Sequence, residues 1–129
     1  MHLSMHNWMR AEPLKVTVAR LAKYGYKSIE ISGEPEQYGQ NGSKDTKKLL
    51  DDYGLKCWGS VTLMLGERNL VAGDAAKRAA SVKYTKDCIT MVKELNGHEM
   101  TIVPATVGKR SEEHTSELQS PCNLVCRLL

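Results

Sequence analysis

Short motifs that assign a chemistry by themselves are missing from this 129-residue sequence. There is no GxSxG nucleophile elbow, no phosphate-binding P-loop, no HExxH zinc helix, and no GxGxxG turn after the first apolar segment. These motifs mark serine hydrolases, nucleoside triphosphatases, zinc proteases and dinucleotide-binding domains. Function must therefore be sought in the order of strands and helices, and in the polar residues that they position.

Long apolar runs and concentrated charge are also absent. No run approaches the roughly 18 to 20 apolar residues of a membrane span, and the N-terminal segment lacks the basic start and apolar core of a secretory signal. The net charge is +3, from 18 basic and 15 acidic residues interspersed along the chain, whereas nucleic-acid binding needs a concentrated basic surface. We expect a cytoplasmic globular protein that contacts neither membranes nor nucleic acid.

Cysteine is scarce, and its spacing indicates no metal or redox chemistry. Cys57, Cys88, Cys122 and Cys126 form neither a CxxC pair nor a zinc-ligand pattern. Cys57 lies in a strand-like run, and Cys88 lies on the apolar face of a helix-like segment. We expect these two residues to be buried thiols that pack as small hydrophobic side chains.

One unit recurs along the chain: an amphipathic helical stretch ends in a glycine, and a short strand-like run follows. The three copies are LAKYGYKSIEIS, LLDDYGLKCWGSV and MVKELNGHEMTIV. Their glycines are Gly25, Gly54 and Gly97. Glycine just past a helix end adopts the left-handed conformation that other residues resist, so we expect all three to end a helix in that way.

Three helices are predicted from apolar residues at helical spacing. The first begins at Pro13, which suits a first helical position. The second spans about Lys44–Tyr53 with Ser43 as a candidate cap, and the third spans about Ala75–Leu95 with Asp74 as its cap. The expected buried stripes are Leu14, Val18, Leu21 and Ala22 in the first helix, and Tyr84, Cys88, Met91, Val92 and Leu95 in the third.

Four strands alternate with these helices, which predicts right-handed crossovers and a parallel sheet. The segments after the strands are long and the turns before them are short, as in TIM barrels, which keep their chemistry on the loops after the strands. We predict an α/β fold that is a partial TIM (β/α)8 barrel, with its first four strands and three helices only; the missing GxGxxG disfavours a Rossmann fold. The expected strands are Leu3–Trp8, Ser28–Ser32, Lys56–Thr62 and Met100–Val103, and the loops are Met9–Glu12, Gly33–Ser43 and Leu63–Gly73.

The character of the sequence changes after Lys109. The segment Arg110–Ser120 has no sustained apolar periodicity, and no fifth strand is predicted before the end. This segment also matches, residue for residue, the frame translation of a common sequencing-library adapter. We therefore expect residues 1–109 to be the N-terminal half of the barrel and residues 110–129 to be a non-native tail, disordered or artefactual. The alternative is a genuine disordered or helical tail.

Four residues are candidates for a ligand pocket. Glu30 lies between Ile29 and Ile31, so it points into the barrel if the two isoleucines face the helices; a buried carboxylate needs an ion pair or a polar site. His6 and Trp8 share a parity at the end of the first strand, and Trp58 lies in the third. Indole faces suit the C–H faces of sugars, and His and Glu suit hydroxyl groups. The alternatives are a structural ion pair for Glu30 and a core position for Trp58.

A metal site cannot be assembled from residues 1–109 by spacing. Several His, Asp or Glu side chains would have to converge from the strand ends. Only His6, Glu30 and Glu34 have suitable positions, and nothing in their spacing requires a metal. His98 precedes the fourth strand on the opposite face of the barrel, where we expect a structural role.

The segments LSMHNWMR, GYKSIEISGEPEQY, CWGSVTLMLG and EMTIVPATVGK resemble the first four strands and following loops of the sugar phosphate isomerase/epimerase family. This family belongs to the xylose isomerase-like TIM barrel superfamily, and the likeness is greatest to ketose 3-epimerases of the psicose/tagatose type. The resemblance covers about residues 1–109. Endonuclease-like members carry metal-binding histidines at the ends of the third and fourth strands; this sequence has none there, which disfavours DNA-repair chemistry.

The resemblance implies a mechanism. Such enzymes hold a divalent Mn or Mg ion with two glutamates, an aspartate and a histidine; one glutamate removes the proton beside the ketose carbonyl and the other returns it. All four ligands would lie on later strands. The resemblance thus implies no catalytic or metal-binding residue in this chain, and it places His6, Trp8, Glu30 and Trp58 along the pocket for a sugar or sugar phosphate.

The sequence therefore predicts a fragment of a metal-dependent sugar epimerase or isomerase of carbohydrate metabolism. The chain itself should be inactive and bind no metal, and its two unpaired sheet edges predict aggregation. The alternative is a non-enzymatic half-barrel that self-associates as a homo-oligomeric assembly module.

Overall fold

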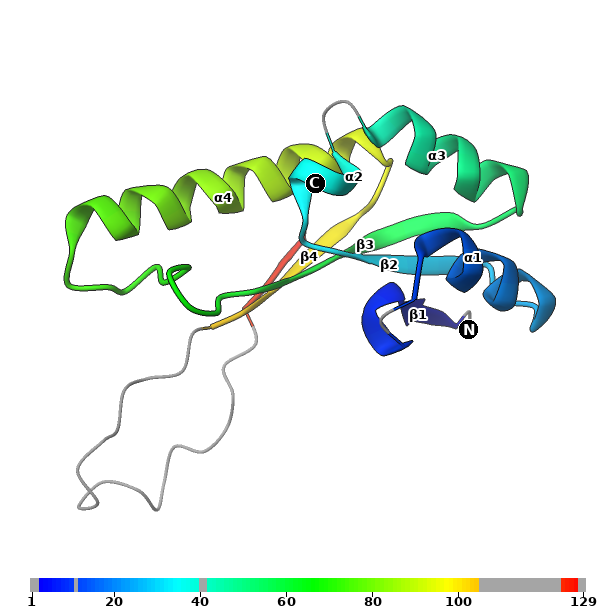
Figure 1. Ribbon diagram of the computed structural model, residues 1–129, viewed down its shortest axis with the longest axis horizontal. Coiled ribbons are helices and arrows are strands. Elements are labelled where there is room, and N and C mark those ends of the chain that lie inside the picture. The colour runs from blue at the N-terminus through cyan, green and yellow to red at the C-terminus, as the bar shows by residue number, and fades with distance from the viewer. Residues whose placement is uncertain (1–2, 11, 40–41, 105–123, 128–129) are drawn as a thin grey trace, which may run out of the picture.

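A sheet of parallel strands, covered on one face by helices, forms the body of the protein (Figure 1). The computed structural model describes residues 3–10, 12–39, 42–104 and 124–127. Four parallel strands pair in chain order: β1 (Ser4–His6), β2 (Ser28–Ser32), β3 (Lys56–Leu63) and β4 (Glu99–Val103). The connecting helices are α1 (Leu14–Lys23), α3 (Ser43–Asp52) and α4 (Ala75–Glu94), and the short helices η1 (Asn7–Arg10) and α2 (Pro35–Tyr38) follow β1 and β2.

The strand order agrees with a partial barrel. The strands lie in the sheet in the same order as in the chain. In a doubly wound sheet, by contrast, the strand order reverses at a switch point. The four predicted strands and the three predicted crossover helices are confirmed, and α2 adds a short helix within the expected loop Gly33–Ser43. Pro35 at the first position of α2 suits a helix start. In the part of the chain that the structure describes, no helix has the length and apolar character needed to cross a bilayer.

The core lies between the sheet and the helices. Ile29 and Ile31 are fully buried there against Val18 and Leu21 of α1 and Val92 of α4. The predicted alternation along β2 is thus confirmed, because Glu30 lies between the two isoleucines and points to the other face. The remaining members of the core cluster are Leu50, Leu55, Cys57, Met91 and Leu95.

Cys57 and Cys88 are both buried, and neither forms a disulfide. Burial raises the pKa of the Cys57 thiol to about 12 and that of the Cys88 thiol to about 11. Both thiols are therefore neutral at physiological pH, as expected of small hydrophobic side chains.

Two of the three helix-ending glycines adopt the predicted left-handed conformation. Gly25 has φ +79° and Gly54 has φ +67°. The prediction for Gly97 is wrong, because the preceding Asn96 takes this conformation with φ +58°, which asparagine tolerates better than most residues. Gly97 serves packing instead: a Cβ there would lie 2.7 Å from Cγ1 of Val92.

The helix starts differ from the predictions in detail. Asp74 caps α4 as expected, since its side chain accepts hydrogen bonds from the backbone N–H groups of Ala76 and Lys77 at 2.7 and 3.1 Å. Ser43 is not the cap of α3 but its first residue, and Gly42 precedes it. Pro13 is the N-cap residue of α1 rather than its first helical residue.

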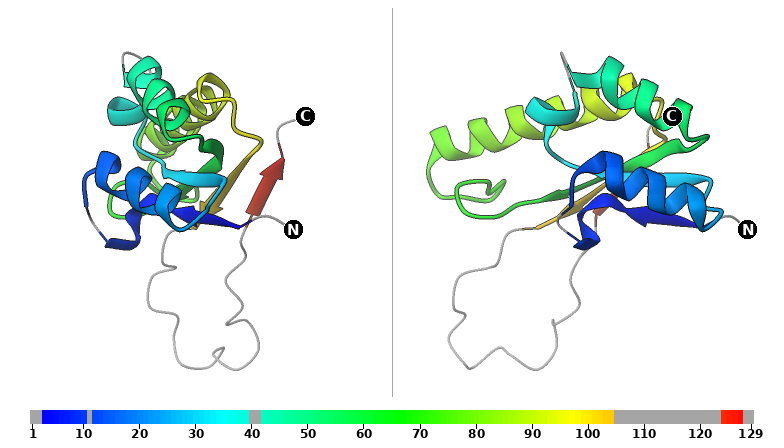
Figure 2. Two further views of the ribbon diagram at one scale, coloured as in Figure 1. Left: turned by 90° about the vertical axis from the view of Figure 1, so that its right-hand side faces the viewer. Right: turned by 45° about the vertical axis from the view of Figure 1, so that its right-hand side comes forward.

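A fifth strand, β5 (Leu124–Arg127), runs antiparallel to β4, with Leu124 opposite Ile102. The expectation that no strand follows the fourth is therefore wrong. Figure 2 shows β5 at the outer edge of the sheet, beside β4. The adapter-like segment Arg110–Ser120 lies outside the described residues.

Candidate functional site

The helix-free face of the sheet carries a row of polar positions. The strand register pairs Glu30 of β2 with His6 of β1 on one side and with Gly59 of β3 on the other. Gly59 in turn pairs with Glu99 of β4. Residues that are paired across parallel strands point to the same face, so His6, Glu30, Gly59 and Glu99 form one row, called here the polar row.

A bulge in β3 brings Gly59 into this row. The register pairs Ile29 with Cys57 and the next residue, Glu30, with Gly59, so Trp58 is the extra residue. A Cβ on Gly59 would lie 2.3 Å from the carbonyl oxygen of Glu99 and 2.9 Å from its Cγ. Only glycine permits this approach, so the backbone and the Cγ of Glu99 occupy the space beside Gly59.

Glu30 is half-buried in the middle of β2. Burial raises the pKa of its carboxyl group from the ordinary value of 4.5, and the negative charge of Glu99 raises it further. The carboxylate forms no ion pair or hydrogen bond with a described residue. It is therefore an acceptor that a ligand hydroxyl group could use.

His6 is the last residue of β1, beside Glu30. Its Nδ1 accepts a hydrogen bond from the backbone N–H of Trp8 at 3.2 Å. Its Nε2 is buried and has no hydrogen-bond partner among the residues that the structure describes. Leaving a buried polar group unsatisfied costs about 1–3 kcal/mol, so His6 is a candidate for binding an external partner. Burial also lowers the pKa of its imidazole.

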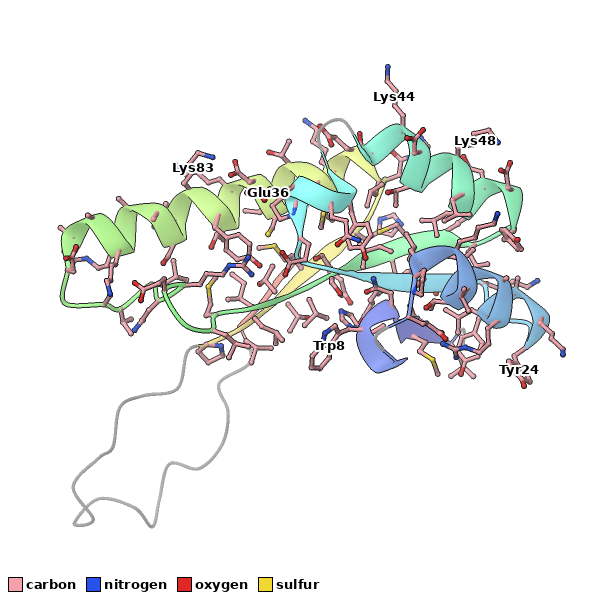
Figure 3. The ribbon with its side chains drawn as sticks, viewed as in Figure 1. Trp8, Tyr24, Glu36, Lys44, Lys48 and Lys83 are labelled. Carbon is pink, nitrogen blue, oxygen red and sulfur yellow. The ribbon has the colours of Figure 1, made fainter. Side chains whose placement is uncertain are left out.

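Trp8 was predicted to end the first strand, but the structure places it outside that strand. β1 ends at His6, and Trp8 lies in η1 with 62% of its surface exposed (Figure 3). The shared strand parity of His6 and Trp8 is therefore wrong, although the hydrogen bond between them keeps the two residues adjacent.

Trp58 lies at the other end of the sheet, near the amino end of β3. Its Nε1 donates to Oε1 of Glu99 at 2.9 Å. Its ring contacts the ring of His98 edge-on, with 5.3 Å between centroids. Trp58 thus supports Glu99 from the amino side of the sheet, while Trp8 follows the carboxyl end of β1.

Asn7 was not predicted as a site residue, yet it organises the carboxyl ends of β1 and β2. Its buried Oδ1 accepts hydrogen bonds from both the backbone N–H and the hydroxyl of Ser32, each at 2.8 Å. Its Nδ2 donates to the hydroxyl of Tyr38 at 3.3 Å. These bonds turn the chain out of β1 and into η1. A single Asn after a short strand gives no sequence signal for such a role.

A second cluster that the sequence did not indicate ties the loop after β3 to the end of β2. Arg68 lies 4.0 Å from the centre of the Tyr84 ring and donates to the Tyr84 hydroxyl at 3.1 Å. The same guanidinium pairs with Glu34 at 3.3 Å. The Tyr84 hydroxyl donates to the carbonyl oxygen of Gly33 at 2.5 Å. Glu34, Arg68 and Tyr84 therefore form a clamp, called here the loop clamp.

The described residues do not fit a divalent metal ion. Among them, no three His, Cys, Asp or Glu side chains converge as metal ligands would. Of the three residues considered by position, Glu34 is paired with Arg68, which leaves only His6 and Glu30. Two donors are too few for the oxygen-rich coordination that Mn and Mg prefer.

Comparisons with known proteins agree with this architecture. The family model described as xylose isomerase-like TIM barrel matches residues 18–126. A crystal structure of D-psicose 3-epimerase in the presence of D-fructose is similar, with a TM-score of 0.64 and 20% identity, covering 76% of this chain and 35% of that chain. A D-psicose 3-epimerase with D-tagatose from Clostridium cellulolyticum H10 has a TM-score of 0.64 and 18% identity, with the same coverage.

The similarity to the two epimerases covers only part of their length. The chain spans 35% of the length of both epimerases, and no curated protein matches it significantly. At this level of identity the two structures establish the fold. Because the family match covers most of the sequence and the parallel strands pair in barrel order, the chain belongs to the xylose isomerase-like TIM barrel family.

Proposed function

We propose that this chain is the N-terminal part of a metal-dependent sugar epimerase or isomerase of carbohydrate metabolism, located in the cytoplasm, and that it is inactive by itself. His6, Trp8 and Glu30 supply one wall of the sugar pocket in this proposal. Trp58 contributes to the pocket indirectly, because its indole N–H holds the side chain of Glu99 in the polar row. The substrate is a ketose or ketose phosphate.

The unsatisfied Nε2 of His6 carries this proposal. It lies at the carboxyl end of β1, the side on which TIM barrels keep their active sites. A neighbouring carboxylate, Glu30, is available as an acceptor, and the exposed indole of Trp8 offers an apolar face. A sugar presents hydroxyl groups and C–H faces together, so it matches all three.

The metal of the intact enzyme belongs to other residues in this proposal. His6, Glu30 and Glu34 are not proposed as ligands of a Mn or Mg ion, because these residues do not converge. The acid and base that exchange the substrate proton are likewise assigned outside the described residues. Proton exchange beside a ketose carbonyl requires both groups, so we expect no turnover from this chain alone.

We further propose that residues 110–129 are not part of the barrel. The antiparallel direction of β5 supports this, because strands joined by crossover helices run parallel, although the family match extends to residue 126. The genomic nucleotide sequence behind residues 105–129 tests the assignment. Adapter codons would support it, and unrelated codons would contradict it.

The pocket is tested with two variants of exposed aromatic residues, Trp8→Ala and Tyr24→Ala. Trp8 and Tyr24 are 62% and 69% exposed and lie in different parts of the surface (Figure 3). Saturation-transfer NMR with D-fructose should show contacts to the unaltered chain that Trp8→Ala removes and Tyr24→Ala retains. Equal signals from both variants would contradict the pocket.

Inactivity is tested with D-fructose and manganese. We expect no epimer to form, and we expect manganese to leave the melting temperature unchanged, since an ion stabilises only a fold that binds it. Turnover that a chelator abolishes would overturn the proposal.

An assembly module is the second candidate, and the helix-free face favours it. Val61, Leu63 and Val103 on this face are only half-buried. Two copies could cover these residues mutually around a two-fold axis. A dimer mass by light scattering, together with a sharp melting transition, would support the module over the enzyme fragment.

A further inference from the structure

The two nitrogens of His6 have different surroundings. Nδ1 accepts from the backbone N–H of Trp8 at 3.2 Å, and a backbone N–H can only donate. Nδ1 must therefore carry no proton. A neutral imidazole has its single proton on the other nitrogen, so the proton of His6 is on Nε2.

The protonated nitrogen of His6 has no hydrogen-bond acceptor among the described residues. This nitrogen, Nε2, is also buried. Its neighbour in the polar row is Glu30, a carboxylate that can only accept when ionised. Side by side, the row therefore offers one N–H donor and one carboxylate acceptor. A sugar carries several hydroxyl groups, so one of its oxygens can accept from His6 and another of its hydroxyls can donate to Glu30.

We propose that the backbone N–H of Trp8 fixes His6 as its Nε2–H tautomer, and that this N–H donates to an oxygen of the ligand. The proposal deepens the proposed function, on which it rests, by giving the direction of one hydrogen bond. His6 then selects an acceptor oxygen of the ligand. Trp8 is a positioning residue here through its backbone, independently of its indole.

The tautomer is measured on the full chain by long-range ¹H–¹⁵N NMR of the histidine rings. The His6 signals are assigned with His6→Gln, and His98→Gln serves as the matched control because His98 is exposed and lies before β4. Near neutral pH we expect a pyrrole-type nitrogen at Nε2 and a pyridine-type nitrogen at Nδ1. A proton on Nδ1, or an even mixture of the two tautomers, would overturn the proposal.

Adding D-fructose separates this inference from the proposed function. We expect the Nε2–H resonance of His6 to shift, and we expect His6→Gln, whose amide can still donate, to retain more D-fructose contact than His6→Phe. If D-fructose perturbs Trp8 and leaves the Nε2–H unchanged, this inference fails while the sugar pocket stands. If D-fructose perturbs neither residue, the proposed function fails and this inference fails with it.

Discussion

Glu30 and Glu99 occupy the same row of the sheet, on the two strands that flank Gly59 of β3. The charge of Glu99 is accordingly a cause, after burial, of the raised pKa of Glu30. Glu99 is held in place by the indole N–H of Trp58 at 2.9 Å. The bulge, the glycine and the tryptophan together set the electrostatics of the polar row.

Glu99→Gln tests this coupling, because the Gln side-chain oxygen can still accept from Trp58. A folded-state pKa above the ordinary 4.5 means that the folded chain binds the Glu30 proton more tightly than the unfolded chain. The free energy of unfolding contributed by Glu30 is therefore greatest below that value and falls as pH rises through the raised pKa. In Glu99→Gln we expect the pKa of Glu30 to be lower, and we expect the free energy of unfolding to fall less as pH rises.

The measurement is an NMR titration of the Glu30 carboxyl group, with urea unfolding at about pH 4 and about pH 7. Glu30→Gln is the control, since it should remove this part of the fall altogether. An unchanged Glu30 pKa in Glu99→Gln would contradict the coupling across Gly59.

Gly59→Ala tests the close approach of β3 and β4. The added Cβ would lie 2.3 Å from the carbonyl oxygen of Glu99, which is backbone and cannot move aside cheaply. We expect a loss of about 1–3 kcal/mol in the free energy of unfolding, as for other overpacked sites. Gly73→Ala is the matched control, because a Cβ at Gly73 meets nothing within 4 Å. Equal urea midpoints for the two variants would contradict the role of Gly59.

The loop clamp gives a third prediction. Tyr84→Phe keeps the ring beneath Arg68 but removes the hydroxyl that bonds the carbonyl oxygen of Gly33 and the guanidinium. We expect a loss of about 0.5–1.5 kcal/mol in stability and faster amide exchange in residues 65–73. Tyr53→Phe, at the end of α3, should change neither quantity. Unchanged exchange in Tyr84→Phe would show that the clamp does not hold the loop.

The order of strands and helices was predictable because it follows from local patterns. Ile29 and Ile31 alternate with polar neighbours, and Asp74 precedes a long helical stretch; each pattern acts within a few residues. The family resemblance was predictable for the same reason, because each segment that carries it is a continuous stretch containing one strand and the loop after it.

The missed features depend on contacts between distant parts of the chain. Asn7 bonds Ser32, and Arg68 contacts Tyr84 and Glu34; nothing in their own neighbourhoods indicates these partners. The end of β1 was missed because the Asn7 bonds draw the chain out of the strand. The place of Gly59 in the polar row depends on a register shift between β2 and β3, which no single-strand pattern reveals.

Removing residues 110–129 gives the last prediction. β5 pairs along β4 from Glu99 to Ile102, so its loss leaves the backbone N–H and C=O groups of that edge unpaired, and unpaired edges promote association. We expect residues 1–109 alone to show a larger mass by light scattering than the full chain at equal concentration. In the full chain, replacing Val125 and Cys126 together by proline should act in the same direction, because one of two adjacent residues in an antiparallel strand donates to the strand opposite and proline cannot donate. An unchanged mass for both variants would show that β5 does not protect the β4 edge.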